Sequence, residues 1–124
     1  MIANSNSMYA FYGSLRRGMM YYDVYKNGLE YQFSSKLSGF KLYALKDYPI
    51  AIKTNHIEDS ITVEIFKIID SQTEKDIHEL ELSVGYYYDE VTIKSITAGI
   101  YLFNHPENYP QVKSGDWVQF FGSR

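Results

Sequence analysis

Residues 61–82, ITVEIFKIIDSQTEKDIHELEL, contain the change of hydrophobic period that sets the fold class. Over residues 61–65 apolar and polar side chains alternate, which predicts a half-buried strand. Residues 71–74, SQTE, match a capping box, with Ser71 as the N-cap and Glu74 reaching back to its amide. We expect this helix to continue to the end of the quoted stretch. A strand followed by a capped helix predicts a domain that mixes both kinds of element.

Strand patterns flank this unit on both sides. They cover residues 8–12, 31–45 with a bend or break at Gly39, an apolar stretch from 48 to 53, 86–96 and 99–103. A short helix is expected at 19–26, and residues 112–120 close the chain with a turn at 114–116. Six or so strands with one or two helices predict an α+β fold, either a small mixed β-barrel or a strongly curled sheet. The length predicts a single domain over residues 1–124.

The composition excludes several classes of function. The chain has no cysteine, so it has no thiol nucleophile, cysteine zinc site or disulfide framework. Its net charge is −3 and its longest basic cluster is Arg16-Arg17, which argues against nucleic-acid binding. The polar first residues and the lack of a long apolar run predict a cytoplasmic protein with no membrane segment. The oligomeric state is left open.

The turn at Tyr12-Gly13-Ser14-Leu15 is the first candidate for chemistry. Glycine allows a ligand to approach the backbone, and consecutive turn amides can bind a carboxylate or an oxyanion. An ordinary turn that ends a strand is the alternative.

Glu81 is the second candidate, because it borders the apolar face of the predicted helix. Partial burial would raise the pKa of this carboxyl group toward that of a useful general base. The alternative is a boundary glutamate that reaches water. Tyr86, Tyr87 and Tyr88 follow in a predicted strand, where one or two of them can line a pocket with Glu81 and the others pack in the core.

Other catalytic sites find little support. His56, His78 and His105 are widely separated in the sequence, so no metal site is predicted. Ser14 lacks the surroundings of a nucleophile elbow. No dinucleotide-binding or Walker A motif is present.

The order of several motifs resembles the gamma-glutamylcyclotransferase-like family. These are FYGSLRRG at 11–18, GFKLY at 39–43 followed by Tyr48-Pro49, the strand at 61–65 with Glu64, IHELE at 77–81, and SGDW at 114–117. The resemblance spans nearly the whole chain. This sequence departs from the family pattern at three positions: His78 replaces an aspartate, Val63 a glycine and Asp89 an arginine. The last change is expected to alter the charge beside the pocket and the choice of substrate.

This resemblance implies an enzyme that cleaves a small γ-glutamyl amide or amine, releasing 5-oxoproline and a free amine. It assigns Glu81 as the general acid/base and the 12–15 turn (Tyr12, Gly13, Ser14, Leu15) to substrate binding, with Tyr87 as a hydrogen-bond donor. It implies no metal or organic cofactor. The identity of the leaving amine stays open. A non-catalytic module of the same fold, binding a small metabolite or another protein, is the alternative.

Overall fold

The computed structural model describes residues 4–122 of the chain. Its elements are β1 (Met8–Phe11), α1 (Met20–Tyr25), the 3-10 helix η1 (Lys26–Gly28), β2 (Leu29–Ser38), β3 (Phe40–Ala44), β4 (Pro49–Lys53), β5 (Ser60–Ile68), α2 (Ser71–Val84), β6 (Tyr87–Ile93), β7 (Ile96–Leu102) and α3 (Trp117–Gly122). The predicted α+β class is confirmed. None of these helices has the length and apolar character needed to cross a membrane.

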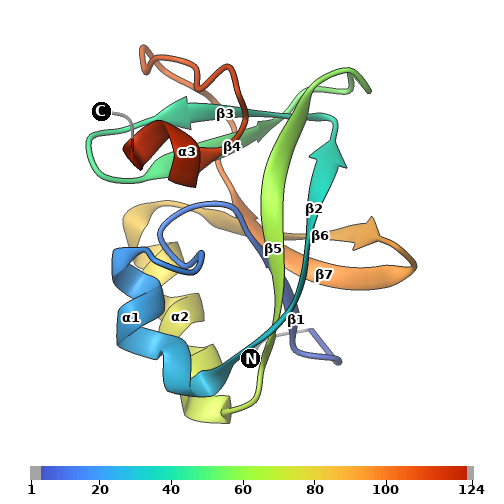
Figure 1. Ribbon diagram of the computed structural model, residues 1–124, viewed down its shortest axis with the longest axis vertical. Coiled ribbons are helices and arrows are strands. Elements are labelled where there is room, and N and C mark those ends of the chain that lie inside the picture. The colour runs from blue at the N-terminus through green and yellow to red at the C-terminus, as the bar shows by residue number, and fades with distance from the viewer. Residues whose placement is uncertain (1–3, 123–124) are drawn as a thin grey trace.

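Five strands form one mixed sheet in the order β2-β5-β1-β7-β6, and β3 and β4 form a separate hairpin (Figure 1). The β1 strand pairs antiparallel with β5 and parallel with β7. The outer strands, β2 and β6, do not pair with each other. The curled sheet is therefore confirmed, and the closed barrel is not formed.

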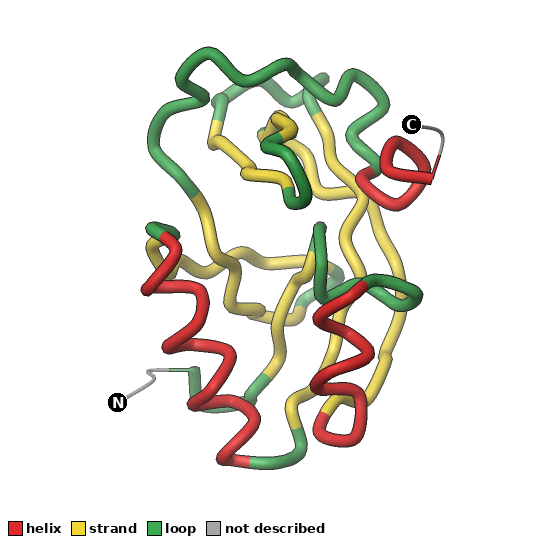
Figure 2. Tube along the Cα trace, turned by 90° about the vertical axis from the view of Figure 1, so that its left-hand side faces the viewer, coloured by secondary structure: helices red, strands yellow, loops and turns green. Residues whose placement is uncertain are grey.

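Alternation along the strands divides the interior into two apolar clusters. In β1, Tyr9 and Phe11 belong to the cluster under helices α1 and α2, whereas Ala10 belongs to the cluster under the β3–β4 hairpin and α3. Figure 2 shows α1 and α2 side by side in front of the strands, with the hairpin beyond their ends. Because both faces of the sheet are covered, β5 is buried on both sides over residues 63–66, and not half-buried as predicted.

The N-terminus of α2 differs from the predicted capping box. Asp70 is the N-cap, and its carboxylate accepts a hydrogen bond of 2.9 Å from the Thr73 amide. Ser71 is the first helical residue, so the prediction was one residue late. Glu74 does not return to the helix start, because its carboxylate accepts a 2.6 Å hydrogen bond from the Tyr9 hydroxyl. This contact satisfies a hydroxyl on a buried strand residue and ties α2 to β1.

The C-terminus of α2 ends at a glycine, as expected. Gly85 adopts the left-handed conformation, with φ of 114°, and its amide donates to the carbonyl groups of Glu81 and Leu82. This conformation favours glycine because a side chain would be strained there. The cap fixes the last turn of α2 and the path of the chain into β6, so it sets the positions of Glu81 and Tyr86.

Candidate active site

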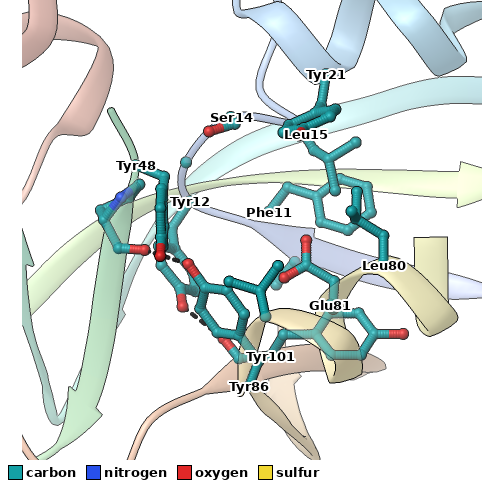
Figure 3. A pocket seen from close by; sticks show the side chains of 14 residues that line it. Phe11, Tyr12, Ser14, Leu15, Tyr21, Tyr48, Leu80, Glu81, Tyr86 and Tyr101 are labelled. Atoms are coloured by element: carbon teal, nitrogen blue, oxygen red, sulfur yellow. Dashed lines mark hydrogen bonds between the residues drawn. The ribbon is translucent and has the colours of Figure 1, made fainter. Parts of the chain in front are cut away.

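A cavity of about 110 Å³ opens between helices α1 and α2, the turn after β1 and the start of β4 (Figure 3). Its walls come from segments far apart in the sequence. They are Ala10, Phe11, Tyr12, Gly13, Ser14, Leu15, Tyr21, Tyr48, Pro49, Leu80, Glu81, Val84, Tyr86 and Tyr101. A concave, mostly apolar site with a few convergent polar groups is the usual form of a small-molecule site.

Glu81 directs its carboxylate into this cavity from the last turn of α2 (Figure 3). No residue in the described part of the chain makes a hydrogen bond or an ion pair with this carboxylate. The side chain keeps some contact with solvent, yet the surrounding protein excludes most of the water. Burial raises the pKa of Glu81 from 4.5 to about 7. A carboxyl group with this pKa can both accept and donate a proton near neutral pH.

The turn at residues 12–15 forms the opposite wall. It is closed by a 3.0 Å hydrogen bond from the Arg16 amide to the Gly13 carbonyl. A Cβ atom on Gly13 would lie 2.7 Å from the Pro49 ring, so this close approach requires glycine. The amide groups of Gly13, Ser14 and Leu15 donate no hydrogen bond to any residue in the described range 4–122. They are available to an anionic or carbonyl group of a ligand.

Ion pairs centred on the buried side chains of Arg16 and Glu64 hold this turn in place. Arg16 Nε donates to Glu64 Oε2 at 3.0 Å, and Arg16 also donates to Asp116 Oδ1 at 2.8 Å. The second Glu64 oxygen accepts hydrogen bonds from the Arg17 amide and from Arg17 Nε. This network joins three of the motifs noticed in the sequence: the turn, the 61–65 strand and the SGDW segment. These residues shape the cavity without lining it.

Two tyrosine hydroxyl groups at the cavity already donate their protons to hydrogen bonds within the protein. Tyr12 donates to the Tyr101 carbonyl and accepts from the Ala51 amide, and Tyr86 donates to the Pro49 carbonyl. A hydroxyl oxygen that has donated its proton can still accept. Each hydroxyl therefore offers a lone pair, and not a proton, to a ligand.

The structure brings Glu81 and the 12–15 turn together but places Tyr87 elsewhere. Tyr87 packs against the cluster under the β3–β4 hairpin and does not line the cavity. The preceding residue, Tyr86, lines the cavity where Tyr87 was expected. Asp89 also lies outside the cavity lining, and its carboxylate is paired with Lys53 at 3.0 Å.

Several wall residues were not found from the sequence, among them the two tyrosines Tyr21 and Tyr101. Tyr101 lies in β7, where alternation alone does not reveal that its face meets α2. Its hydroxyl is hydrogen-bonded to His78 Nδ1 at 2.9 Å, so the histidine at the unusual motif position supports the cavity wall. Among the described residues, no three histidine, aspartate or glutamate side chains gather in a group that could hold a metal ion.

Comparison with known proteins assigns the chain to a family. Residues 9–119 match the family described as gamma-glutamyl cyclotransferase, AIG2-like. The chain belongs to this family. A Pyrococcus horikoshii protein, provisionally named a gamma-glutamylcyclotransferase, is 29% identical over 108 residues, covering 87% of this chain and 88% of its own.

Solved structures of AIG2-like and related proteins share the fold. The crystal structure of the same P. horikoshii protein superimposes with a TM-score of 0.79 and 27% identity, covering 94% of this chain and 93% of that one. An AIG2-like protein from Mus musculus gives a TM-score of 0.70 at 16% identity, with 86% of each chain covered. The second likeness, at this low identity, concerns the fold alone.

Proposed function

We propose that this protein is a γ-glutamyl cyclotransferase that converts a small γ-glutamyl amide into 5-oxoproline and a free amine. The observation that carries the proposal is the unpaired Glu81 carboxylate, with a pKa of about 7, in a cavity that is also lined by Gly13, Ser14 and Leu15, whose amides donate to no described residue. Membership of the AIG2-like family supports the same reaction.

The reaction is an intramolecular displacement. Glu81 takes a proton from the α-ammonium group of the glutamyl unit, and the α-nitrogen attacks the γ-carbonyl carbon. A new C–N bond closes the five-membered ring, and the original amide C–N bond breaks. Two protons leave the α-nitrogen in all, and both are delivered to the departing nitrogen. A carboxyl group with a pKa near the working pH can carry each of them in turn.

The remaining groups hold the substrate in a bent conformation. The amides of Gly13, Ser14 and Leu15 bind the α-carboxylate of the glutamyl unit or the oxyanion formed at the γ-carbon. The oxygen lone pairs of Tyr12 and Tyr86 accept hydrogen bonds from the α-nitrogen. Fixing the nucleophile next to the carbonyl carbon removes much of the entropy cost of ring closure.

The decisive experiment compares Glu81→Gln with Glu79→Gln. Glu79 is on the same helix but is exposed, so its variant controls for the loss of one carboxylate. Each purified protein is incubated with γ-glutamyl amino acids and γ-glutamyl amines, and 5-oxoproline is measured by mass spectrometry. We expect Glu81→Gln to lose about 10²–10⁴-fold in kcat/KM, and Glu79→Gln to retain the parent value.

Two results would contradict the proposal in different ways. Parent-like turnover by Glu81→Gln would remove Glu81 from the mechanism. Absence of 5-oxoproline from the folded parent across all substrates would favour a binding module of the same fold, which calorimetric titration with the same compounds would then test.

A further inference from the structure

Tyr101 forms the end of the cavity that lies opposite the 12–15 turn. Figure 3 shows it next to Glu81, on the side of the carboxylate away from Ser14 and Leu15. Tyr101 belongs to β7, an interior strand of the sheet, and only 4% of its surface is exposed. Burial and the nearby charge of Glu81 both raise the pKa of the Tyr101 hydroxyl. On this side the carboxylate therefore faces an aromatic residue and not solvent.

Three contacts fix the orientation of the Tyr101 ring. It stacks on the Tyr9 ring, with centres 6.2 Å apart and an interplanar angle of 5°, and the Tyr88 ring meets it edge-on at 5.7 Å. Its hydroxyl is bonded to His78. A Cβ atom on Gly99 would lie 2.7 Å from the Tyr88 ring and 2.9 Å from the Tyr9 ring, so this packing requires glycine.

On its outer side Tyr101 contacts side chains that reach the surface. His78 and Tyr88 are both half-buried, and their ring centres lie 5.8 and 5.7 Å from that of Tyr101. Neither of them lines the cavity. The Tyr101 ring thus lies between the cavity and a region that water reaches.

The hydration of Glu81 controls its protonation, because the described residues that line the cavity carry no other charge. Burial is the cause of its raised pKa. His78, one turn earlier on α2, is bonded to the Tyr101 hydroxyl outside the cavity. The titratable side chains that line the cavity with Glu81 are tyrosines, a residue type ordinarily uncharged at neutral pH: Tyr21 of α1, Tyr12 after β1, Tyr48 before β4, Tyr86 before β6 and Tyr101 of β7.

We propose that Tyr101 is a positioning residue of the active site, whose ring keeps the Glu81 carboxylate apart from the water that reaches His78 and Tyr88. This inference rests on the proposed function, in which Glu81 is the general acid/base, and adds a residue that acts through it. The ring is the part that acts. The hydroxyl is dispensable for this role, because it is bonded to His78 and not to a group in the cavity.

The test removes the ring with a residue that suits a strand. Tyr101→Val keeps a β-branched apolar side chain in β7 and opens space between Glu81 and His78, two polar groups that can hold a water molecule. Hydration favours the ionised carboxylate, so the pKa of Glu81 should fall by at least about one unit. Tyr101→Phe keeps the ring and should leave this pKa at about 7. Carbon-13 NMR of the glutamate carboxyl groups measures it without substrate, and Glu81→Gln identifies the resonance.

Turnover gives a second readout. The midpoint of the pH profile of kcat/KM should move down in Tyr101→Val by the same amount as in the NMR titration. Because a carboxylate with a lower pKa is a weaker base, kcat at pH 8 should fall about three- to tenfold, with a smaller change in KM. Tyr101→Phe should keep the parent profile.

Phe66→Val is the matched control. Phe66 is fully buried and belongs to the same apolar cluster as Tyr101, but it does not line the cavity. Its substitution also removes a buried ring, so it should destabilise the fold and leave the pKa of Glu81 at about 7. If Tyr101→Val does not fold, Tyr101→Leu removes less volume and should show a smaller shift in the same direction.

The outcomes separate this inference from the proposed function. An unchanged pKa of Glu81 in folded Tyr101→Val or Tyr101→Leu would overturn the inference. An equal fall in Phe66→Val would also overturn it, because general loosening of the cluster would then be the cause. A fall confined to the variants that lack the Tyr101 ring, without 5-oxoproline from the parent on any substrate, would remove the proposed function and leave the effect of the ring on Glu81 standing.

Discussion

Glu64 and Glu81 are both withdrawn from solvent, but their surroundings are opposite. Glu64 is 4% exposed, and its two oxygens accept three hydrogen bonds, all from Arg16 and Arg17. Glu81 has no such partner among the described residues, and burial raises its pKa to about 7. One glutamate is bound by two arginines and holds the 12–15 turn. The other is poised between its two protonation states beside that turn.

This difference shows that burial alone does not give a carboxylate a function. A buried charge costs free energy unless it is paired, and Glu64 is paired with Arg16 and Arg17. At Glu81 the cost is not offset. Uncompensated burial of a titratable group in a cavity is typical of catalytic sites, where stability is given up for reactivity.

The largest effect is expected when the paired glutamate loses its partner. Arg16→Met removes the hydrogen bond to Oε2 of the buried Glu64 and the ion pair with Asp116, and should lower the free energy of unfolding by about 3–5 kcal/mol. Urea denaturation followed by Trp117 fluorescence measures it. Lys53→Met, which breaks the exposed pair with Asp89, is the control and should cost less than about 1 kcal/mol. Equal losses in the two variants would contradict the special role of the Glu64 network.

Substitution of the unpaired glutamate, Glu81, should raise the free energy of unfolding instead of lowering it. Because the folded state raises the pKa of Glu81, it favours the protonated form, so the parent loses stability as the pH rises from about 4.5 to about 7. Glu81→Gln should therefore be more stable than the parent by about 3 kcal/mol at pH 8, and equal to it near pH 4. Thermal or urea unfolding at both pH values tests this, with Glu79→Gln as control. A destabilised Glu81→Gln at pH 8 would show that the carboxylate has a stabilising partner.

The pH dependence of turnover measures the pKa of Glu81 independently of stability, and the expected change in free energy per pH unit is smaller. The base must be ionised, so kcat/KM should rise about tenfold per pH unit, or 1.4 kcal/mol, up to about pH 7 and then level. Initial rates of 5-oxoproline release between pH 5 and 9 would reveal the midpoint. A profile that is flat from pH 5 upward would mean that the pKa of Glu81 stays near 4.5.

The smallest effect is expected at the wall that supports the cavity. His78→Phe removes the hydrogen bond to the Tyr101 hydroxyl and should cost about 1 kcal/mol of unfolding free energy, as for a neutral hydrogen bond. Because His78 does not line the cavity, kcat/KM should change less than about threefold. A loss of turnover as large as that of Glu81→Gln would extend the catalytic machinery to this histidine.

Local patterns predicted most elements and part of the site. The alternation in β5, the glycine after α2 and the bend at Gly39 act over a few neighbouring residues, so the sequence reports them directly. The capping box was wrong by one residue because Glu74 has a better partner in Tyr9, a contact across 65 positions. The same limit applies to the three tyrosines that follow α2: alternation in a strand does not say which face meets the cavity, and Tyr86 lines it rather than Tyr87, the residue that the family resemblance assigned to the pocket.

The sequence by itself determined the order of the strands and of helices α1 and α2, the α+β class, the resemblance to the family and the residue types at Glu81 and the 12–15 turn, but it did not reveal helix α3. Only the tertiary structure decided that these two segments face each other across one cavity. It also decided that Glu64 is paired while Glu81 is not. The reason is physical: the protonation of a carboxylate depends on the water and charges around it, and packing between distant segments sets both.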